Sequence, residues 1–242
     1  MNLPILVCGH TVPPLVPVRG DFPDWFRAGL GLDAARAPAI DLPGGDPLPA
    51  PRDCGGVVVT GSPAMVTAGE PWSVAAEGWL AEAHAAGVPI LGVCYGHQLL
   101  ARALGGAVDW NPRGREIGTI EVELTPAADD DPLLQGLERP LVAQASHSQS
   151  VSELPPGAVL LGSNTIDPHQ AFRLGATTWG VQFHPEFDAE IIRGYIEHRA
   201  ESLREEGLEP AALSAATRDR AAGATLLRRF RHAASQASAG SD

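Results

Sequence analysis

One cysteine of this sequence is placed where a nucleophile could act. Cys94 lies in GVCYGHQLL, residues 92–100, directly after the apolar run VPIL, and Gly92 and Gly96 flank it. The pattern G-x-C-x-G is the thiol counterpart of G-x-S-x-G, in which a sharp turn joins a strand to a helix. Free N–H groups and the dipole at the start of that helix would stabilise a thiolate. The alternative is an ordinary buried cysteine, the interpretation we adopt for Cys8 and Cys54.

A thiol nucleophile needs a base, and the base needs a group that orients it. His184 and Glu186 lie in WGVQFHPEF, residues 179–187. Pro185 biases His184 toward an extended backbone, in which residues two apart point to the same side. His184 is therefore a candidate base, with Glu186 holding its ring in the working tautomer. Taken alone, His-Pro-Glu is also compatible with an ordinary loop.

Short apolar runs and helix-like stretches alternate around these motifs. Residues 5–9, 56–60 and 88–93 predict buried strands, whereas residues 71–87 and the stretch after Cys94 predict helices. This alternation predicts an α/β fold with a flavodoxin-like open, mostly parallel sheet and helices on both faces. Ligands bind such sheets outside the carboxyl ends of the strands, so Cys94 and His184 are expected at one edge.

The pattern changes in the second half of the chain. Residues 118–125 alternate apolar and polar side chains, and further short strands follow, which predicts an added antiparallel stretch. Helices are predicted over residues 189–206 and 210–234. We expect one domain over residues 1–206, and a helical extension with a disordered end over residues 207–242.

Composition excludes several classes of function. The 242 residues include 17 basic and 29 acidic side chains, a formal net charge of −12, which disfavours nucleic acid and anionic membranes as partners. No apolar run is long enough for a membrane span, and the N-terminus is typical of a strand rather than a signal peptide. Three cysteines without paired spacing favour a reducing compartment, so we expect a cytoplasmic protein. No metal-binding spacing is found, and neither a metal nor an organic cofactor is expected.

Two long motifs in the same order point to a known family. GVCYGHQLLARALGG and GVQFHPEF resemble the class I glutamine amidotransferase domain, above all the glutaminase portion of GMP synthase and its stand-alone relatives. The resemblance covers roughly residues 3–200. VVVTGSPAMV (57–66) is similar to the family's oxyanion strand, NPRGREIGTIEVEL (111–124) to its hairpin, and ASHSQSV (145–151) to a substrate-pocket loop.

The resemblance implies a role for each matching position. Cys94 would be the nucleophile, His184 the acid and base, and Glu186 its orienting partner. The backbone N–H groups of Ser62 and Tyr95 would form the oxyanion hole. The substrate pocket would include Gly61, Gln98, His147, Ser148 and Gln149. The implied reaction attacks a γ-carboxamide through a cysteinyl thioester and releases glutamate with ammonia or an amine.

The sequence also departs from the family. Ser62 stands where many members have a second glycine, and serine tolerates fewer backbone conformations. We expect Arg115 and Glu116 to be a structural pair of the hairpin. Residues 201–242, which follow the match, contain no P-loop, so this chain is not expected to make GMP by itself.

Three functions are therefore compared. The first is a glutamine amidotransferase (glutaminase) that hydrolyses glutamine and delivers ammonia to a separate synthetase subunit. The second is a stand-alone γ-glutamyl hydrolase that cleaves γ-glutamyl amides without a partner. The third is a non-catalytic binding module on the same fold, which the presence of Cys94, His184 and Glu186 argues against.

Overall fold

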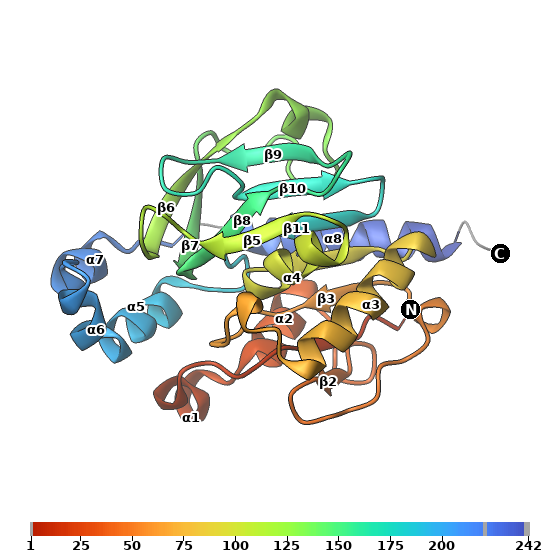
Figure 1. The fold of residues 1–242 in the computed structure, drawn as a ribbon, viewed down its shortest axis with the longest axis horizontal. Coiled ribbons are helices and arrows are strands. Elements are labelled where there is room, and N and C mark those ends of the chain that lie inside the picture. Colours follow the sequence, from red (N-terminus) through yellow and green to blue (C-terminus); the bar gives the residue numbers. More distant parts are fainter. Residues whose placement is uncertain (1, 220–221, 240–242) are drawn as a thin grey trace.

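The computed structural model describes residues 2–219 and 222–239, in which a central sheet carries helices on both faces (Figure 1). The strands are β1 (Ile5–Val7), β2 (Ala39–Asp41), β3 (Val57–Val59), β4 (Ile90–Val93), β5 (Ala107–Trp110), β6 (Glu116–Leu124), β7 (Leu141–His147), β8 (Gln149–Glu153), β9 (Val159–Ser163), β10 (Ala171–Leu174) and β11 (Thr178–Val181). The α-helices are α1 (Val16–Arg19), α2 (Phe22–Leu30), α3 (Pro71–Ala85), α4 (Tyr95–Ala103), α5 (Ala189–His198), α6 (Ala200–Glu205), α7 (Pro210–Ala216) and α8 (Ala222–Ala239).

The sheet has a parallel and an antiparallel half. Within the described ranges its strand order is β2-β1-β3-β4-β11-β10-β9-β6-β7, and neighbours from β2 to β11 pair in parallel. That order of parallel strands is the flavodoxin-like one. The strands from β10 to β7 add to it in antiparallel pairs, and β5 and β8 form a separate small sheet. The expected fold class is confirmed.

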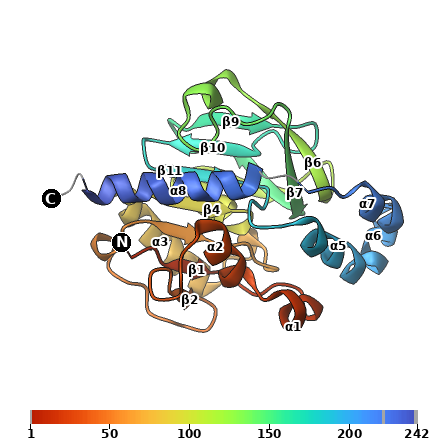
Figure 2. The same cartoon turned by 180° about the vertical axis from the view of Figure 1, so that it is seen from behind.

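Each face of the parallel half packs against its own pair of helices. In β3, the side chain of Val58 enters the core cluster that includes residues of α2 and α8, whereas Val57 and Val59 enter the cluster of α3 and α4. This alternation follows from the two-residue period of a strand, and it is why these strands are apolar throughout. Figure 1 shows α3 and α4 in front of the sheet, and Figure 2 shows α8 and α2 on the opposite side.

The parallel register brings the two candidate motifs together. Cys94 follows β4 directly, and its N–H donates to the carbonyl of Val181 at the end of β11 (2.9 Å). Gly96 donates to the carbonyl of Thr60, just after β3 (3.1 Å). The segments after β3, β4 and β11 therefore meet at one carboxyl edge of the sheet, as the parallel fold requires.

Both helices predicted near the C-terminus are divided, so each was wrong as a single element. Residues 189–206 form α5 and α6, which meet at Arg199 (φ −98°, ψ 8°). Residues 210–234 form α7 and the start of α8, and Thr217 has an extended backbone (ψ 131°). Tertiary hydrogen bonds hold the segment after Thr217 outside a helix, because Arg218 N donates to Thr119 Oγ1 and Asp219 accepts from Ala189 N.

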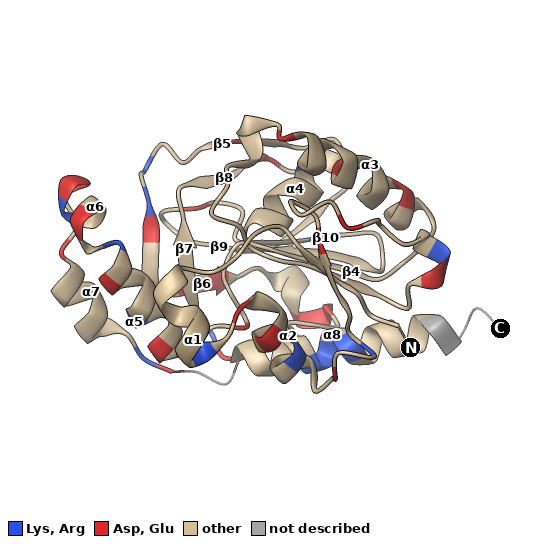
Figure 3. Ribbon diagram, turned by 90° about the horizontal axis from the view of Figure 1, so that it is seen from below, with Lys and Arg blue, Asp and Glu red and all other residues tan. Residues whose placement is uncertain are grey.

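Helix α8 lies across the second face of the sheet, packed on α2 (Figure 2). Its helical conformation continues to Ala239, where the sequence predicted a disordered end, and residues 240–242 lie outside the described residues. Its arginines, the blue stretch in Figure 3, lie within the helix, and Arg229 donates to the carbonyls of Leu133 and Gln135 (3.0 and 2.7 Å). In the part of the chain that the structure describes, no helix has the length and apolarity that crossing a membrane requires.

Candidate active site

The turn that carries Cys94 is strained. Cys94 is the N-cap of α4 and has φ 53° and ψ −104°, and no other non-glycine residue in the described ranges has a positive φ. A Cβ atom on Gly92 would lie 2.5 Å from the carbonyl oxygen of Gly96, and one on Gly96 would collide with the carbonyl oxygen of Val59. Only glycine therefore fits at positions 92 and 96. Strained backbone conformations such as that of Cys94 are found mainly at the functional sites of proteins.

His184 and Glu186 form a buried pair beside this turn. His184 Nδ1 lies 2.7 Å from Glu186 Oε1, and their side chains are 3% and 0% exposed. The N–H of His184 donates to the carbonyl of Gln144 in β7 (2.8 Å). The imidazole stacks on Phe187 with ring centroids 4.0 Å apart. A Cβ on Gly61 would lie 2.9 Å from His184 Cε1, so the glycine makes room for the ring.

The three cysteines differ in acidity. Burial raises the pKa of the Cys8 thiol well above its usual range, and burial with the nearby Asp53 raises the pKa of Cys54 to about 11. Burial also acts to raise the pKa of Cys94, but its charge attraction to His184 and a hydrogen bond between the two side chains outweigh it, so the pKa is lowered. Cys94 alone among them is therefore suited to act as a thiolate.

His184 is the complementary cation. Burial by itself would lower its pKa, but Glu186 and the Cys94 thiolate, through charge and hydrogen bonds, raise it above the usual range. The other oxygen of Glu186, Oε2, is buried and has no hydrogen-bond partner among the described residues. The carboxylate is therefore directed at the imidazole alone. The arrangement can present a thiolate next to a protonated imidazole, which can donate its proton to a leaving group.

The two candidate oxyanion donors come from different segments near Cys94. Tyr95 is the first residue of α4, a position whose N–H has no acceptor within the helix. Ser62 follows β3, and its hydroxyl accepts from the N–H of Ala64 (3.0 Å) in a turn. The backbone of Ser62 is outside the left-handed region, so serine fits here without the freedom of glycine. Ser62, Tyr95 and Cys94 line one small cavity.

The predicted substrate-pocket residues form one connected wall. Gln98 of α4 donates to the carbonyl of Gln149 (2.7 Å) and to Gln182 Oε1 (3.0 Å). The side-chain amide of Gln149 donates to Thr67 Oγ1 (2.6 Å), and the carbonyl of Ser148 accepts from Asn111 N (2.9 Å). The side chains of Gln98 and Gln149 thus hold the loop between β7 and β8 in place.

His147 belongs to a second buried His–Glu pair. Its Nε2 lies 2.9 Å from Glu116 Oε2, and its Nδ1 lies 3.0 Å from the carbonyl oxygen of Gln149. Both ring nitrogens therefore face acceptors, which favours the doubly protonated imidazolium. Burial opposes the charge, but the hydrogen bond and the charge of Glu116 raise the pKa of His147 overall. Arg115 and Glu116, expected to be structural residues of the hairpin, contact different partners, since Arg115 is bonded to Glu206 (2.8 Å).

Cys94 lies where two cavities meet. The smaller cavity, of about 70 Å³, contains the predicted pocket residues other than Gly61, which lies against His184. The larger one, of about 1020 Å³, is also lined by Cys94, together with His184 and residues of α5 and α6. Within the described residues, no group of three or more His, Cys, Asp or Glu side chains could hold a metal ion.

Comparison with known proteins identifies the family. The sequence pattern described as Glutamine amidotransferase class-I matches residues 47–196. The chain belongs to this family. It is 36% identical over 142 residues to a glutamine-hydrolyzing GMP synthase subunit from Methanopyrus kandleri, a match that covers 58% of this chain and 71% of that protein.

Two further relatives define the extent of the similarity. The glutamine-hydrolyzing GMP synthase of Thermosipho africanus is 37% identical to this amidotransferase over 115 residues. The match covers 45% of this chain but only 21% of the length of that relative. A glutamine amidotransferase from Methylobacillus flagellatus has a solved structure with a TM-score of 0.73 and 27% identity, and the match covers 99% of this chain and 94% of the other.

Several residues of this site are not found by sequence reasoning. Phe22 of α2 stacks on His184 with ring centroids 6.2 Å apart, although the two are distant in sequence. Arg199 lines both cavities together with Cys94. Neither residue belongs to a recognisable motif, since their contribution depends on how distant helices pack. Phe187, by contrast, lies inside the quoted WGVQFHPEF motif and its aromatic character was a usable signal.

Proposed function

We propose that this chain is a glutaminase of the amidotransferase type, which hydrolyses the γ-carboxamide of glutamine to glutamate and ammonia. The observation that carries the proposal is the strained Cys94 turn, with the His184–Glu186 pair beside it and a lowered thiol pKa. The family membership and the similarity to a glutamine-hydrolyzing GMP synthase support the same reaction.

The reaction would proceed in two halves. The Cys94 thiolate attacks the carboxamide carbon, and the N–H groups of Ser62 and Tyr95 stabilise the resulting oxyanion, for which each donor contributes about 3–4 kcal/mol. His184 gives its proton to the departing nitrogen, the C–N bond breaks, and a glutamyl thioester remains. Neutral His184 then takes a proton from water as the oxygen attacks the thioester, so that glutamate leaves and the thiolate–imidazolium pair is restored.

Ammonia would be used by a separate synthetase subunit. The Methanopyrus kandleri relative is named as one subunit of a GMP synthase, which supports this assignment by analogy. That this chain passes ammonia to such a subunit is part of what we propose. The test is to add candidate synthetase subunits to the purified protein.

One observation favours a second candidate, a stand-alone γ-glutamyl hydrolase. The cavity of about 1020 Å³ beside Cys94 and His184 is much larger than a departing ammonia requires. A γ-glutamyl amide whose nitrogen carries a further substituent could place that substituent there. The same nucleophile would then release an amine in place of ammonia.

The test is glutamate release by the purified chain from L-glutamine and from a γ-glutamyl dipeptide, with the Cys94→Ser variant as the blank. Release from glutamine that Cys94→Ser abolishes supports the glutaminase. Faster release from the dipeptide supports the hydrolase. A Cys94→Ser variant that retains most of the activity contradicts both, because each requires this nucleophile.

A further inference from the structure

Arg199 contributes a cation to the wall of the site from outside the family match. It lies between α5 and α6, three positions after the match ends at residue 196. Like Cys94, it lines both the small and the large cavity. The fold therefore places a guanidinium beside the nucleophile from a segment that the family pattern does not include.

In the described part of the chain this guanidinium forms no direct ion pair, although the Glu206 carboxylate is close enough to interact with its charge. No ion pair is found for Arg199, its Nε is buried without a hydrogen-bond partner, and its charge lies 5.9 Å from the centroid of the Tyr195 ring. Burial and the nearby Arg115 lower its pKa, but an arginine stays protonated in proteins. Arg199 is half-buried and no hydrogen bond is found for its guanidinium among the described residues, so an anionic ligand at this position would gain charge-assisted hydrogen bonds.

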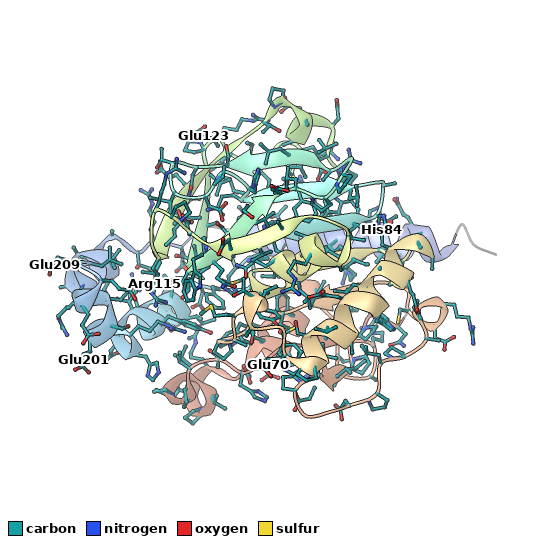
Figure 4. All side chains as sticks on the ribbon, in the orientation of Figure 1. Glu70, His84, Arg115, Glu123, Glu201 and Glu209 are labelled. Atoms are coloured by element: carbon teal, nitrogen blue, oxygen red, sulfur yellow. The ribbon has the colours of Figure 1, made fainter. Side chains whose placement is uncertain are left out.

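The neighbouring Arg115 differs from Arg199 in having a directly bonded carboxylate. Arg115 also lines the small cavity, but it forms two hydrogen bonds of 2.8 Å with Glu206, and this pairing lowers the pKa of Glu206. Arg115 lies beside α5–α7 in Figure 4. Arg115 is thus hydrogen-bonded to Glu206 directly, whereas Arg199 interacts with that carboxylate through charge alone.

Charge distinguishes the two cavities. The residues around the small cavity include Arg115, Arg199 and the His147 imidazolium, and none of them is acidic. The wall of the large cavity includes Glu70, Glu201 and Glu205. The wall of the large cavity also includes Arg199 and His184, so its charge is mixed, whereas the small cavity has cationic and no acidic side chains and attracts a ligand carboxylate more strongly.

We propose that Arg199 binds the α-carboxylate of the γ-glutamyl substrate in the small cavity and thereby selects glutamyl compounds over amides that lack this group. The inference rests on the proposed function, because it assumes that a γ-carboxamide is presented to Cys94. When the carboxamide carbon of glutamine lies at the thiolate, three carbons of the side chain and backbone separate it from the α-carboxylate of the same molecule. Planar arginine suits a carboxylate because two N–H groups can donate to its two oxygens.

The experiment compares two ligands in the Cys94→Ser background, where neither is consumed. L-Glutamine and 4-aminobutanamide share the carboxamide and the amine but differ in the α-carboxylate. We expect Arg199→Gln to weaken calorimetric binding of L-glutamine by about 10- to 100-fold and to leave that of 4-aminobutanamide unchanged. Arg199→Lys should restore part of the loss. Arg204→Gln is the matched control, since it removes an exposed arginine of α6 that lines neither cavity.

Each other outcome overturns the inference. Equal weakening of both ligands would mean a general structural role, and no weakening of L-glutamine, or no binding of it to the Cys94→Ser protein, would mean that Arg199 does not hold its carboxylate. Thermal unfolding of each variant monitors folding. Failure of the proposed function is read separately, as absence of glutamate release by the chain that retains Cys94.

Discussion

Replacing Glu116 by glutamine should remove the charge that keeps His147 protonated. The Glu116 carboxylate accepts from His147 Nε2 (2.9 Å), Gln170 Nε2 (2.6 Å) and Asn164 Nδ2 (2.6 Å). The side chains of His147 and Glu116 are 1% and 6% exposed, so water cannot take over these bonds. A glutamine has one acceptor oxygen, and its own NH2 group would face at least one of the three donors.

The cost follows from leaving a buried charge unpaired. Breaking a buried pair by removing one partner typically destabilises by about 3–5 kcal/mol. For a chain of this length that corresponds to a fall in melting temperature of roughly 6–20 °C. The matched control is Glu123→Gln, because Glu123 lies exposed on the same strand β6, and its substitution should change the melting temperature by no more than about 1–2 °C.

The pH dependence gives a sharper test than the size of the loss. The pKa of His147 is raised in the folded protein, so the proton is held more tightly than in the unfolded chain, where the pKa is about 6.5. The stabilisation that comes from protonated His147 is fully present below its pKa in the unfolded chain, and it is lost as the pH rises through its pKa in the folded protein. The difference in unfolding free energy between wild type and Glu116→Gln should therefore be larger at about pH 6 than at about pH 9.

The same substitution should also change the reactivity of Cys94. The positive charge of His147 is one of the influences that lower the pKa of the thiol. With His147 neutral, the pH profile of Cys94 alkylation by iodoacetamide should move to higher pH. The reasoning would be refuted by a variant that melts within a degree or two of the wild type, or by a stability difference that does not vary with pH.

Two further predictions concern the catalytic turn and its base. Glu186→Gln should lower kcat by about 100-fold and change KM much less, because in the proposed mechanism Glu186 orients His184 and does not hold substrate; a raised KM at constant kcat would make it a binding residue. Gly96→Ala should destabilise by about 1–3 kcal/mol and reduce kcat, since its Cβ would collide with the Val59 carbonyl. The control is Gly78→Ala, at an open helical position, which should stabilise slightly in thermal unfolding. An unchanged melting temperature for Gly96→Ala would contradict the packing at the turn.

The parts of the site that sequence could predict are those encoded locally. Two glycines around Cys94 specify a tight turn. A proline after His184 favours an extended backbone, in which the side chains of His184 and Glu186 point to the same side. The parallel strands before them were apolar throughout, so the shared edge of the sheet followed from the fold class. These features need no knowledge of which distant residues pack together.

The parts that sequence could not predict depend on register and on helix packing. Glu116 was expected only to be a structural residue of the hairpin, and the antiparallel register of β6 and β7 sets it opposite His147. A shift of one residue would turn Glu116 to the other face of the strand, and the local sequence does not fix that register. The division of the helix at Arg199 was also missed, because the stretch from 189 to 206 is uniformly compatible with a helix.

The division at Arg199 bears directly on specificity. The family match ends at residue 196 and includes the nucleophile, its base and the loop before β8. Residues that follow it line the large cavity, among them Arg199, Glu201, Ser202 and Glu205. In the proposed mechanism, the residues that form the thioester lie in the part shared with the family, and we expect the residues of α6 to influence which substituent on the departing nitrogen is accepted. A chimera that exchanges residues 200–205 for those of a relative, and so keeps Arg199 and Glu206, should consequently alter which γ-glutamyl amides are cleaved and leave alkylation of Cys94 by iodoacetamide unchanged.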